Sequence, residues 1–398
     1  MQRSLADDRE IGREYTLADR IRTTHVGSLP RPPELVDLLI NKEKGEPVDA
    51  SRLEELTVSA VENAVARQRQ TGIDIVNDGE MSKMTYATYV RYRCTGIHPS
   101  RSPRQRRMSE HFTKNYPGWV QRLQLSWNAH PFIECECDGE LSVKDVELLL
   151  ADLRHLRAAA DKAGASDVFM TAASPGIIAD YIPNRFYRTH EQYLAALIDV
   201  MRPEYEAIVN AGFTLQLDCP DLPANPGPDE TEAECHAKTM LAIEAINAAT
   251  AKIDPQRMRM HLCWGNGEGP HDTDRPLSEV LPIALKARPH AIAFEGANPR
   301  HEHEWAYFEE NAFPDDRVII PGVINNLTTF VEHPELVAQR ISRYTRSLGA
   351  DRVIAGVDCG FGTWAVTPFD PDIAFAKLRS LVEGAALAST DRFVGAAC

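Results

Sequence analysis

The sequence lacks several features that mark common functional classes. No apolar stretch in its 398 residues approaches the about 18 residues that a membrane-spanning helix needs. Positive charge is also scarce, since 43 Lys and Arg stand against 58 Asp and Glu and give a net charge of -15. This charge repels nucleic-acid phosphates and anionic lipid, so we expect neither nucleic acid nor a membrane as a partner.

Two nucleotide-binding fingerprints are missing as well. There is no G-x-G-x-x-G at a strand-to-helix turn and no P-loop, and the spacing of Gly265, Gly267 and Gly269 fits neither pattern.

The polar N-terminal stretch has no continuous apolar core of the kind found in secretion signals. We therefore expect a cytoplasmic protein, whose eight cysteines are thiols or metal ligands rather than disulfides.

Short β-branched runs alternate with amphipathic stretches along the whole sequence. Strands are expected at 23–26, 73–77, 167–171, 214–218, 258–263, 291–295, 318–323 and 353–357. Helices are expected at 51–70, 143–163, 192–211, 230–251, 277–287, 333–348 and 372–385. This alternation predicts an α/β fold, a (β/α)8 TIM barrel, with a doubly wound open sheet and an appended domain as the alternative.

We expect residues 1–20 to form an N-terminal arm and residues 21–398 to form a single barrel domain. The alternation of predicted strands and helices is interrupted between about 95 and 140, a stretch that contains Arg101, Arg104, Arg106 and Arg107. This stretch is interpreted as an insertion after the second strand, over the barrel mouth. It is either a solvated basic loop or a segment that helps to hold an anionic substrate.

Polar side chains follow nearly every predicted strand at its C-terminal end, where the active sites of such barrels lie. In chain order they are His25 and Ser28, Asp78 and Glu80, Asp218, His261 and Cys263, Glu295, Asn325 and Asn326, and Asp358 and Cys359. Surface residues without a shared role would rarely be distributed in this way. We therefore expect a functional site at this face of the barrel.

Four of these residues form a candidate metal site. His261 and Cys263 lie on one face of a strand because side chains alternate with period two, and Cys359 and Glu295 could converge on them from nearby strands. Two thiolates, an imidazole and a carboxylate suit Zn²⁺. The alternative is a chance H-x-C whose cysteines are small buried hydrophobic residues.

Three other clusters are less favoured as metal sites. Cys135 and Cys137 lie in the irregular insertion without a partner pair, and His301 and His303 open a predicted helix, where residues two apart face different directions. The pair at 235–236 lies on a helix with acidic neighbours and is interpreted as a solvated face.

At this point the motifs resemble those of a known family. Residues 23–30 read TTHVGSLP, 78–80 read DGE and 215–220 read LQLDCP, and all three are similar to motifs in the catalytic barrel of cobalamin-independent methionine synthases. The segments at 261–263, 294–295 and 358–360 are similar to the zinc-ligand motifs of that family, in the same order. The resemblance extends from about residue 21 to 385, and the family also includes single-barrel relatives such as epoxyalkane:coenzyme M transferases.

The resemblance implies a function and a set of site residues. His261, Cys263, Glu295 and Cys359 would hold zinc, which lowers the pKa of a substrate thiol. Glu80 and Asp218 would bind the ammonium of homocysteine, and Glu295, Asp218 and Glu80 are the candidate catalytic residues. Ser28 and its neighbour His25 would contact the carboxylate of the substrate, and Asn325 and Arg185 are further candidates for substrate contacts.

The sequence departs from the family at one position of chemical importance. The family has a histidine after the seventh strand as the proton donor to the folate leaving group, whereas residues 322–329 contain Asn325 and Asn326, and the next histidine is His333. A nitrogen leaving group needs that proton. The departure therefore favours a corrinoid or sulfonium methyl donor, or an epoxide, over methyltetrahydrofolate.

Three functions remain open on this evidence. The leading hypothesis is zinc-dependent methyl transfer to a thiol such as homocysteine. The second is an epoxyalkane:coenzyme M transferase, in which Arg185, Arg188 and the arginines of the insertion would bind the sulfonate. The third is a metal-free or non-catalytic barrel. The partners are then a small-molecule thiol and a methyl or alkyl donor, with a homodimer as a possible assembly.

Overall fold

The computed structural model describes residues 20–101, 109–129, 133–227, 229–367 and 369–390. Eight parallel strands form its central sheet: β1 (Arg22–Thr23), β2 (Ile75–Val76), β5 (Asp167–Ala173), β6 (Thr214–Asp218), β7 (Met258–His261), β8 (Ala291–Phe294), β9 (Val318–Ile324) and β10 (Ile354–Val357). Their order is β1-β10-β9-β8-β7-β6-β5-β2, and a parallel bridge between Thr24 and Ile75 joins the two ends. The predicted (β/α)8 barrel is confirmed.

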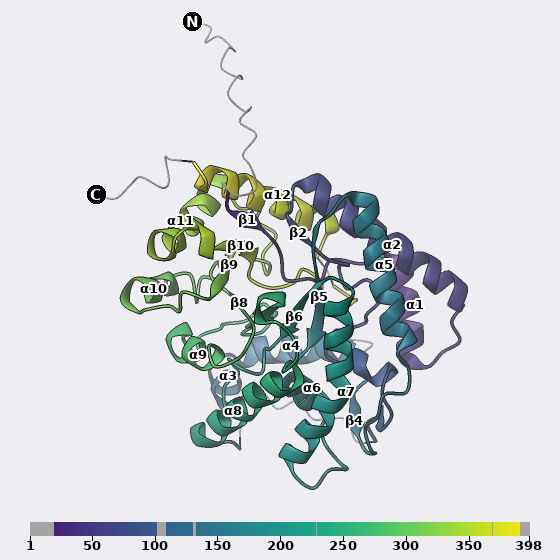
Figure 1. Ribbon diagram of the computed structural model, residues 1–398. Helices are drawn as coiled ribbons and strands as arrows, with labels where there is room; N and C mark the ends of the chain where they lie inside the picture. Colours follow the sequence, from purple (N-terminus) through teal and green to yellow (C-terminus); the bar gives the residue numbers. More distant parts are fainter. Residues whose placement is uncertain (1–19, 102–108, 130–132, 228, 368, 391–398) are drawn as a thin grey trace, which may run out of the picture.

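Helices surround these strands (Figure 1). Those expected from the sequence are α2 (Ala50–Thr71), α5 (Glu147–Ala163), α7 (His190–Asn210), α8 (Glu232–Ala249), α9 (Leu277–Ala284), α11 (Pro334–Leu348) and α12 (Pro371–Ala388). Further helices are α1 (Pro33–Lys44), α6 (Pro175–Tyr181) and α10 (Tyr307–Glu310), with 3₁₀ turns η1 (Tyr89–Tyr92), η2 (Pro255–Arg257), η3 (Glu304–Ala306) and η4 (Ala350–Arg352). Among the described residues, none of the helices combines the length and apolar character of a membrane span.

Local capping explains where several of these helices begin and end. The side chain of Asp49 accepts hydrogen bonds from the backbone N–H groups at the start of α2, and Gly72 ends that helix in a left-handed conformation with φ 98°. At α8, Thr231 and Glu234 form a reciprocal capping box. Such caps satisfy backbone groups that have no partner inside the helix.

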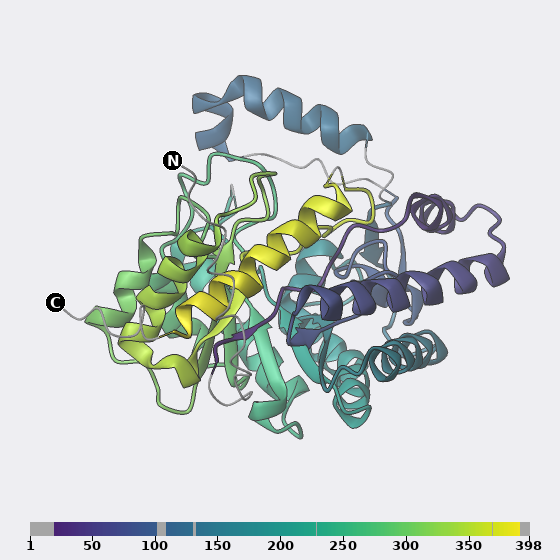
Figure 2. The ribbon, with the colours of Figure 1, turned by 90° about the horizontal axis from the view of Figure 1, so that it is seen from above.

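The insertion after β2 contains more regular structure than its sequence suggests. Strand β3 (Ile97–Pro99) pairs antiparallel with β4 (Cys135–Cys137), and between them lie α3 (Glu110–Asn115) and α4 (Pro117–Ala129). Figure 2 shows these blue helices lying across one end of the barrel. Tyr116 donates a hydrogen bond to Asp272 at 2.7 Å and the Trp119 indole donates to the Glu268 carbonyl at 3.1 Å. The helices therefore contact the loop that follows β7.

Several residues of the predicted insertion and of the termini lie outside the residues that the structure describes. Arg104, Arg106, Arg107 and Cys398 are among them, as is the predicted N-terminal arm except for Arg20. Of the arginine cluster, Arg101 is described, and its side chain is 85% exposed.

A buried arginine fills the middle of the barrel. The Arg259 guanidinium lies over the Phe169 ring at 3.4 Å from its centroid. Its Nε donates to Gln216 at 2.7 Å, and its two Nη groups donate to Thr24 and to the His25 carbonyl at 2.9 and 2.8 Å. Each nitrogen of this buried cation donates a hydrogen bond, so the side chain ties β7 to β6 and to the segment after β1.

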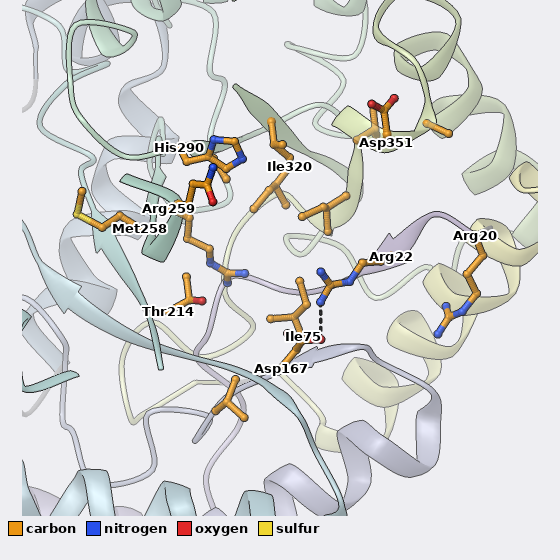
Figure 3. Close-up of a pocket in the computed structure, with 17 residues that line it drawn as sticks. Arg20, Arg22, Ile75, Asp167, Thr214, Met258, Arg259, His290, Ile320 and Asp351 are labelled. Carbon is orange, nitrogen blue, oxygen red and sulfur yellow. Dashed lines mark ion pairs between the residues drawn. The ribbon is translucent and has the colours of Figure 1, made fainter. Parts of the chain in front are cut away.

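A cavity of about 470 Å³ opens at the end of the barrel where the strands begin. Figure 3 shows Arg22, Thr214 and Met258, which open β1, β6 and β7, around this space. Arg22 forms an ion pair with Asp167 at 2.8 Å. Because barrel active sites lie at the other end, this cavity is separate from the candidate site described next.

Candidate metal centre

Three side chains at the C-terminal ends of β7 and β10 form one compact group. His261 is the last residue of β7, Cys263 follows it by two positions, and Cys359 comes two residues after β10. One ligand atom from each lies within 4.8 Å of the other two, and the Cys263 and Cys359 sulfurs are 3.6 Å apart. Among the described residues, this is the one such group of three or more His, Cys, Asp or Glu side chains.

The geometry of the group fits a zinc ion. Two sulfurs at the usual Zn–S distance in a tetrahedral site are separated by about 3.8 Å, which is close to the separation seen here. All three side chains are buried, and both cysteines are free thiols. Two thiolates and one imidazole are the donors that zinc prefers, so the residues present are suited to this metal.

Glu295, the fourth predicted ligand, lies next to the group but is not part of it. It follows β8, and its carboxylate accepts hydrogen bonds from the Trp264 backbone N–H at 3.0 Å and from the Asn298 amide at 2.8 Å. These bonds fix the orientation of the carboxylate and leave each oxygen with a further lone pair. In the structure the protein therefore offers three converging donors and one adjacent carboxylate.

Hydrogen bonds and charge tune the three donors. His261 Nδ1 is 3.4 Å from Asp218 Oδ1, and its Nε2 is 3.2 Å from the Asp358 carbonyl. Burial lowers the pKa of His261, but Asp218 and the charge of Cys263 outweigh burial and raise it to about 9. The pKa of Cys263 is lowered because Cys359 donates its S–H to it. One ring nitrogen could bind a metal while the other keeps an acceptor that orients the imidazole.

The two predicted ammonium-binding carboxylates are both buried. Glu80 accepts a hydrogen bond from Thr171 Oγ1 at 3.0 Å through Oε1, while its Oε2 has no hydrogen-bond partner within the described chain. Burial raises the pKa of Glu80 to about 7. Asp218 accepts from the Gln216 amide at 2.7 Å. Glu80 thus retains an unused acceptor oxygen, and Asp218 contacts the group of His261, Cys263 and Cys359 through His261.

The residues after β1 have different surroundings. His25 Nε2 is hydrogen-bonded to Gln68 of α2 at 2.8 Å, and burial lowers its pKa to about 4. Ser28 lies beside the loop that follows β10, since its carbonyl accepts from the Phe361 N–H at 3.0 Å and a Cβ on Gly360 would meet its Oγ at 2.0 Å. Ser28 is therefore brought close to the Cys359 loop, whereas His25 is neutral and bonded to α2.

Two further candidates are engaged elsewhere. The Asn325 side chain accepts from the Leu327 N–H at 2.8 Å and so stabilises its own turn. Arg185 is 61% exposed and lies 3.6 Å from Glu136 of β4, at the edge of the insertion. Neither has a described contact with the His261, Cys263 and Cys359 group.

Three more residues shape the site: Asp358, which was expected at this face without a stated role, and Tyr86 and Arg31, which the sequence did not single out. Asp358 accepts hydrogen bonds from the Gly296 and Ala297 N–H groups at 2.8 Å each, which fixes the loop after β8. The hydroxyl of the partly buried Tyr86 has a pKa raised well above its usual range by desolvation and by nearby groups that include Asp218 and both cysteines. Arg31 lies at a junction of loops, as described below. Only Asp358 carried a signal, because it adjoins a predicted ligand.

The less favoured clusters have structural partners in the fold. His301 bonds to Asp274 at 3.1 Å and Glu304 at 2.8 Å, and its ring lies 4.5 Å from that of Trp264. Cys135 accepts a hydrogen bond from Arg91 at 3.0 Å. These contacts account for their burial without a metal.

Comparisons of the sequence with known proteins found similarity to two kinds of enzyme. No family model matches it. A methionine synthase from Thermococcus kodakarensis is 23% identical over 368 residues, which cover 91% of each chain. A 2-hydroxypropyl-CoM lyase from Xanthobacter autotrophicus is 28% identical over 168 residues, which cover 36% of this chain and 43% of that one.

A solved structure shares the fold over almost its whole length. This is a B12-independent methionine synthase from Shewanella sp. W3-18-1 in complex with selenomethionine, with a TM-score of 0.70 at 18% identity, covering 94% of this chain and 99% of that chain. The barrel is therefore shared with that protein from end to end.

Proposed function

We propose that this chain, a relative of the cobalamin-independent methionine synthases as its motifs predicted, is a zinc-dependent methyltransferase. It would transfer a methyl group to the thiol of homocysteine or of a similar amino acid. The observation that carries this proposal is the convergence of His261, Cys263 and Cys359 within 4.8 Å at the barrel end where catalysis takes place.

His261, Cys263 and Cys359 would hold the zinc, with the adjacent Glu295 carboxylate as a further ligand. Bound zinc would lower the pKa of the acceptor thiol so that a thiolate nucleophile exists at neutral pH, where a free thiol with a pKa near about 8.5 is mostly protonated. Asp218 would keep the His261 ring in the orientation needed for binding.

The other residues of the site would bind the acceptor. Glu80 offers an unpaired oxygen in a buried setting, which is suited to an ammonium group. Asp218 adds a second negative charge, and Ser28 is placed beside the Cys359 loop for the carboxylate end of the substrate. His25 and Asn325 would act at the edge of this site, through the segments that they stabilise.

The methyl donor is constrained by the segment after β9. Asn325 and Asn326 stand there, and an amide cannot supply a proton to a leaving group. A donor whose leaving group departs without protonation, such as a sulfonium or a corrinoid, therefore suits the site better than methyltetrahydrofolate.

A second candidate is the opening of an epoxide by coenzyme M. It is favoured by the partial similarity to 2-hydroxypropyl-CoM lyase. This reaction needs a cation for the sulfonate, but Arg185 lies against Glu136, and Glu80 and Asp218, which would face the charged end of the thiol, are carboxylates. Methyl transfer to an amino-acid thiol is therefore the better supported proposal.

A thiol-binding experiment separates the two candidates. We expect zinc-loaded protein to bind homocysteine in calorimetric titration and to bind coenzyme M at least about tenfold more weakly, because a sulfonate would face Glu80 and Asp218. With homocysteine as acceptor, methionine should form from a sulfonium or methylcobalamin donor. Tighter binding of coenzyme M, or no methionine from any donor, would contradict the proposal.

A further inference from the structure

Arg31 lies at the point where three loops at the barrel mouth meet. Its side chain is fully buried. Its Nε donates to the Glu80 carbonyl at 3.1 Å, and its Nη1 donates to the Gly362 carbonyl at 2.7 Å and to the Leu29 carbonyl at 3.4 Å. These carbonyls belong to the loops after β2, β10 and β1. One guanidinium thus connects the segments that carry Glu80, Cys359 and Ser28.

The loop after β2 needs such support because its backbone is strained. Glu80 has φ 58° and follows Gly79 at φ 68°, so two successive residues are left-handed. For a residue with a side chain this conformation is energetically unfavourable. The Arg31 bond to the Glu80 carbonyl, together with the bond from the Glu80 N–H to Asp78 at 2.9 Å, holds the residue in this conformation.

The side chains of Arg31 and Glu80 also face each other. Arg31 Nη2 is 3.9 Å from Glu80 Oε2, which is close enough for charge attraction and too far for a hydrogen bond. Neither atom has a hydrogen-bond partner within the described chain. Thr171 holds the other oxygen of Glu80. The carboxylate is therefore oriented from two sides while Oε2 keeps its capacity to accept a hydrogen bond.

We propose that Arg31 is a positioning residue for the acceptor, which places the Glu80 carboxylate so that its free oxygen receives the substrate ammonium. This inference rests on the proposed function, in which Glu80 binds that ammonium. Arg31 acts through Glu80 and does not touch the substrate. A lysine could not replace it, because a single ammonium cannot reach the carbonyls of all three loops in the way that a planar guanidinium does.

The test compares two buried arginines and two thiols. Arg93 is the matched control, since it is 6% exposed and forms an ion pair with Glu204 away from the candidate metal site. The ligands are homocysteine and 4-mercaptobutyrate, which is the same molecule without its amino group. Calorimetric titration of zinc-loaded Arg31→Met and Arg93→Met gives the dissociation constant of each thiol, and the zinc content of each variant is measured in parallel.

We expect Arg31→Met to bind homocysteine about tenfold more weakly, with little change for 4-mercaptobutyrate and with zinc retained. Arg93→Met should bind both thiols as the wild type does. Adding Arg31→Met to Glu80→Gln should change homocysteine affinity by less than about twofold, since both act on one contact. If Arg31→Met does not fold, Arg31→Lys takes its place, with a smaller loss that is again confined to homocysteine.

Two outcomes would overturn the inference. One is equal weakening of both thiols by Arg31→Met, and the other is full additivity with Glu80→Gln, because either means that Arg31 acts on the fold rather than through Glu80. If the wild-type protein itself binds no homocysteine, the proposed function fails first. The two failures are therefore distinguishable.

Discussion

Replacing Cys359 by serine should remove most of the bound zinc and lower the rate of thiol methylation by about 1000-fold or more. A metal site that loses a thiolate is expected to lose several kcal/mol of transition-state stabilisation. The Cys359 sulfur lies 3.6 Å from that of Cys263, and a serine hydroxyl neither ionises readily nor binds zinc as a thiolate does. Zinc content by atomic emission and initial rates with homocysteine provide the measurement.

Cys94→Ser is the matched control for this substitution. Cys94 is also a buried free thiol, but it precedes β3 and is not part of the group formed by His261, Cys263 and Cys359. It should keep about one zinc per chain and near wild-type rates. Wild-type zinc content in Cys359→Ser would show that this cysteine is not a ligand.

The second large effect is expected from Glu80→Gln. The variant keeps the size of the side chain but loses its charge, so homocysteine binding should weaken on the order of 100-fold, the range for a charged hydrogen bond. The loss should appear in KM more than in kcat, since Glu80 binds the ammonium rather than the reacting sulfur. Steady-state kinetics with homocysteine and 4-mercaptobutyrate measure it.

The pH dependence of this contact has a defined sign. Burial raises the pKa of Glu80 to about 7, while Lys83 lowers it and Asp218 raises it further. As the pH falls through this value Glu80 gains a proton and loses its charge, so the preference for homocysteine over 4-mercaptobutyrate should decline. Glu80→Gln should show a small and pH-independent preference. An unchanged preference in the variant would contradict the role given to Glu80.

The barrel and the convergence of His261, Cys263 and Cys359 could be predicted because both follow from simple periodicities. Strand alternation places His261 and Cys263 on one face, and parallel strands bring their C-terminal ends to a common edge, which Cys359 also reaches. These arguments need only the positions of the strands. The structure places all three side chains together accordingly.

Features that depend on side-chain direction or on long-range contacts were harder to predict from the sequence. Glu295 follows its strand as expected, but the rotation of its carboxylate towards Trp264 and Asn298 depends on neighbouring loops. Arg185 was a plausible cation, yet Glu136, which comes from a different segment, pairs with it. The role of Arg31 depends on Gly362, which is 331 positions away, and no local pattern reveals such a contact.

The insertion shows a further limit of pattern reading. Its two strands have three residues each and lie on either side of α3 and α4, so neither strand is long enough to display an alternation. The sequence marked it as irregular, whereas the structure shows a hairpin with two helices that contact the loop after β7.

Zinc-edge X-ray absorption of the zinc-loaded protein, recorded before and after homocysteine is added, tests the central claim most directly. The account predicts two sulfur ligands at about 2.3 Å and a histidine nitrogen in the free protein. It predicts a third sulfur at the same distance when homocysteine is bound. A sulfur count that stays at two while homocysteine binds, or a zinc environment without two cysteine sulfurs, would contradict the account.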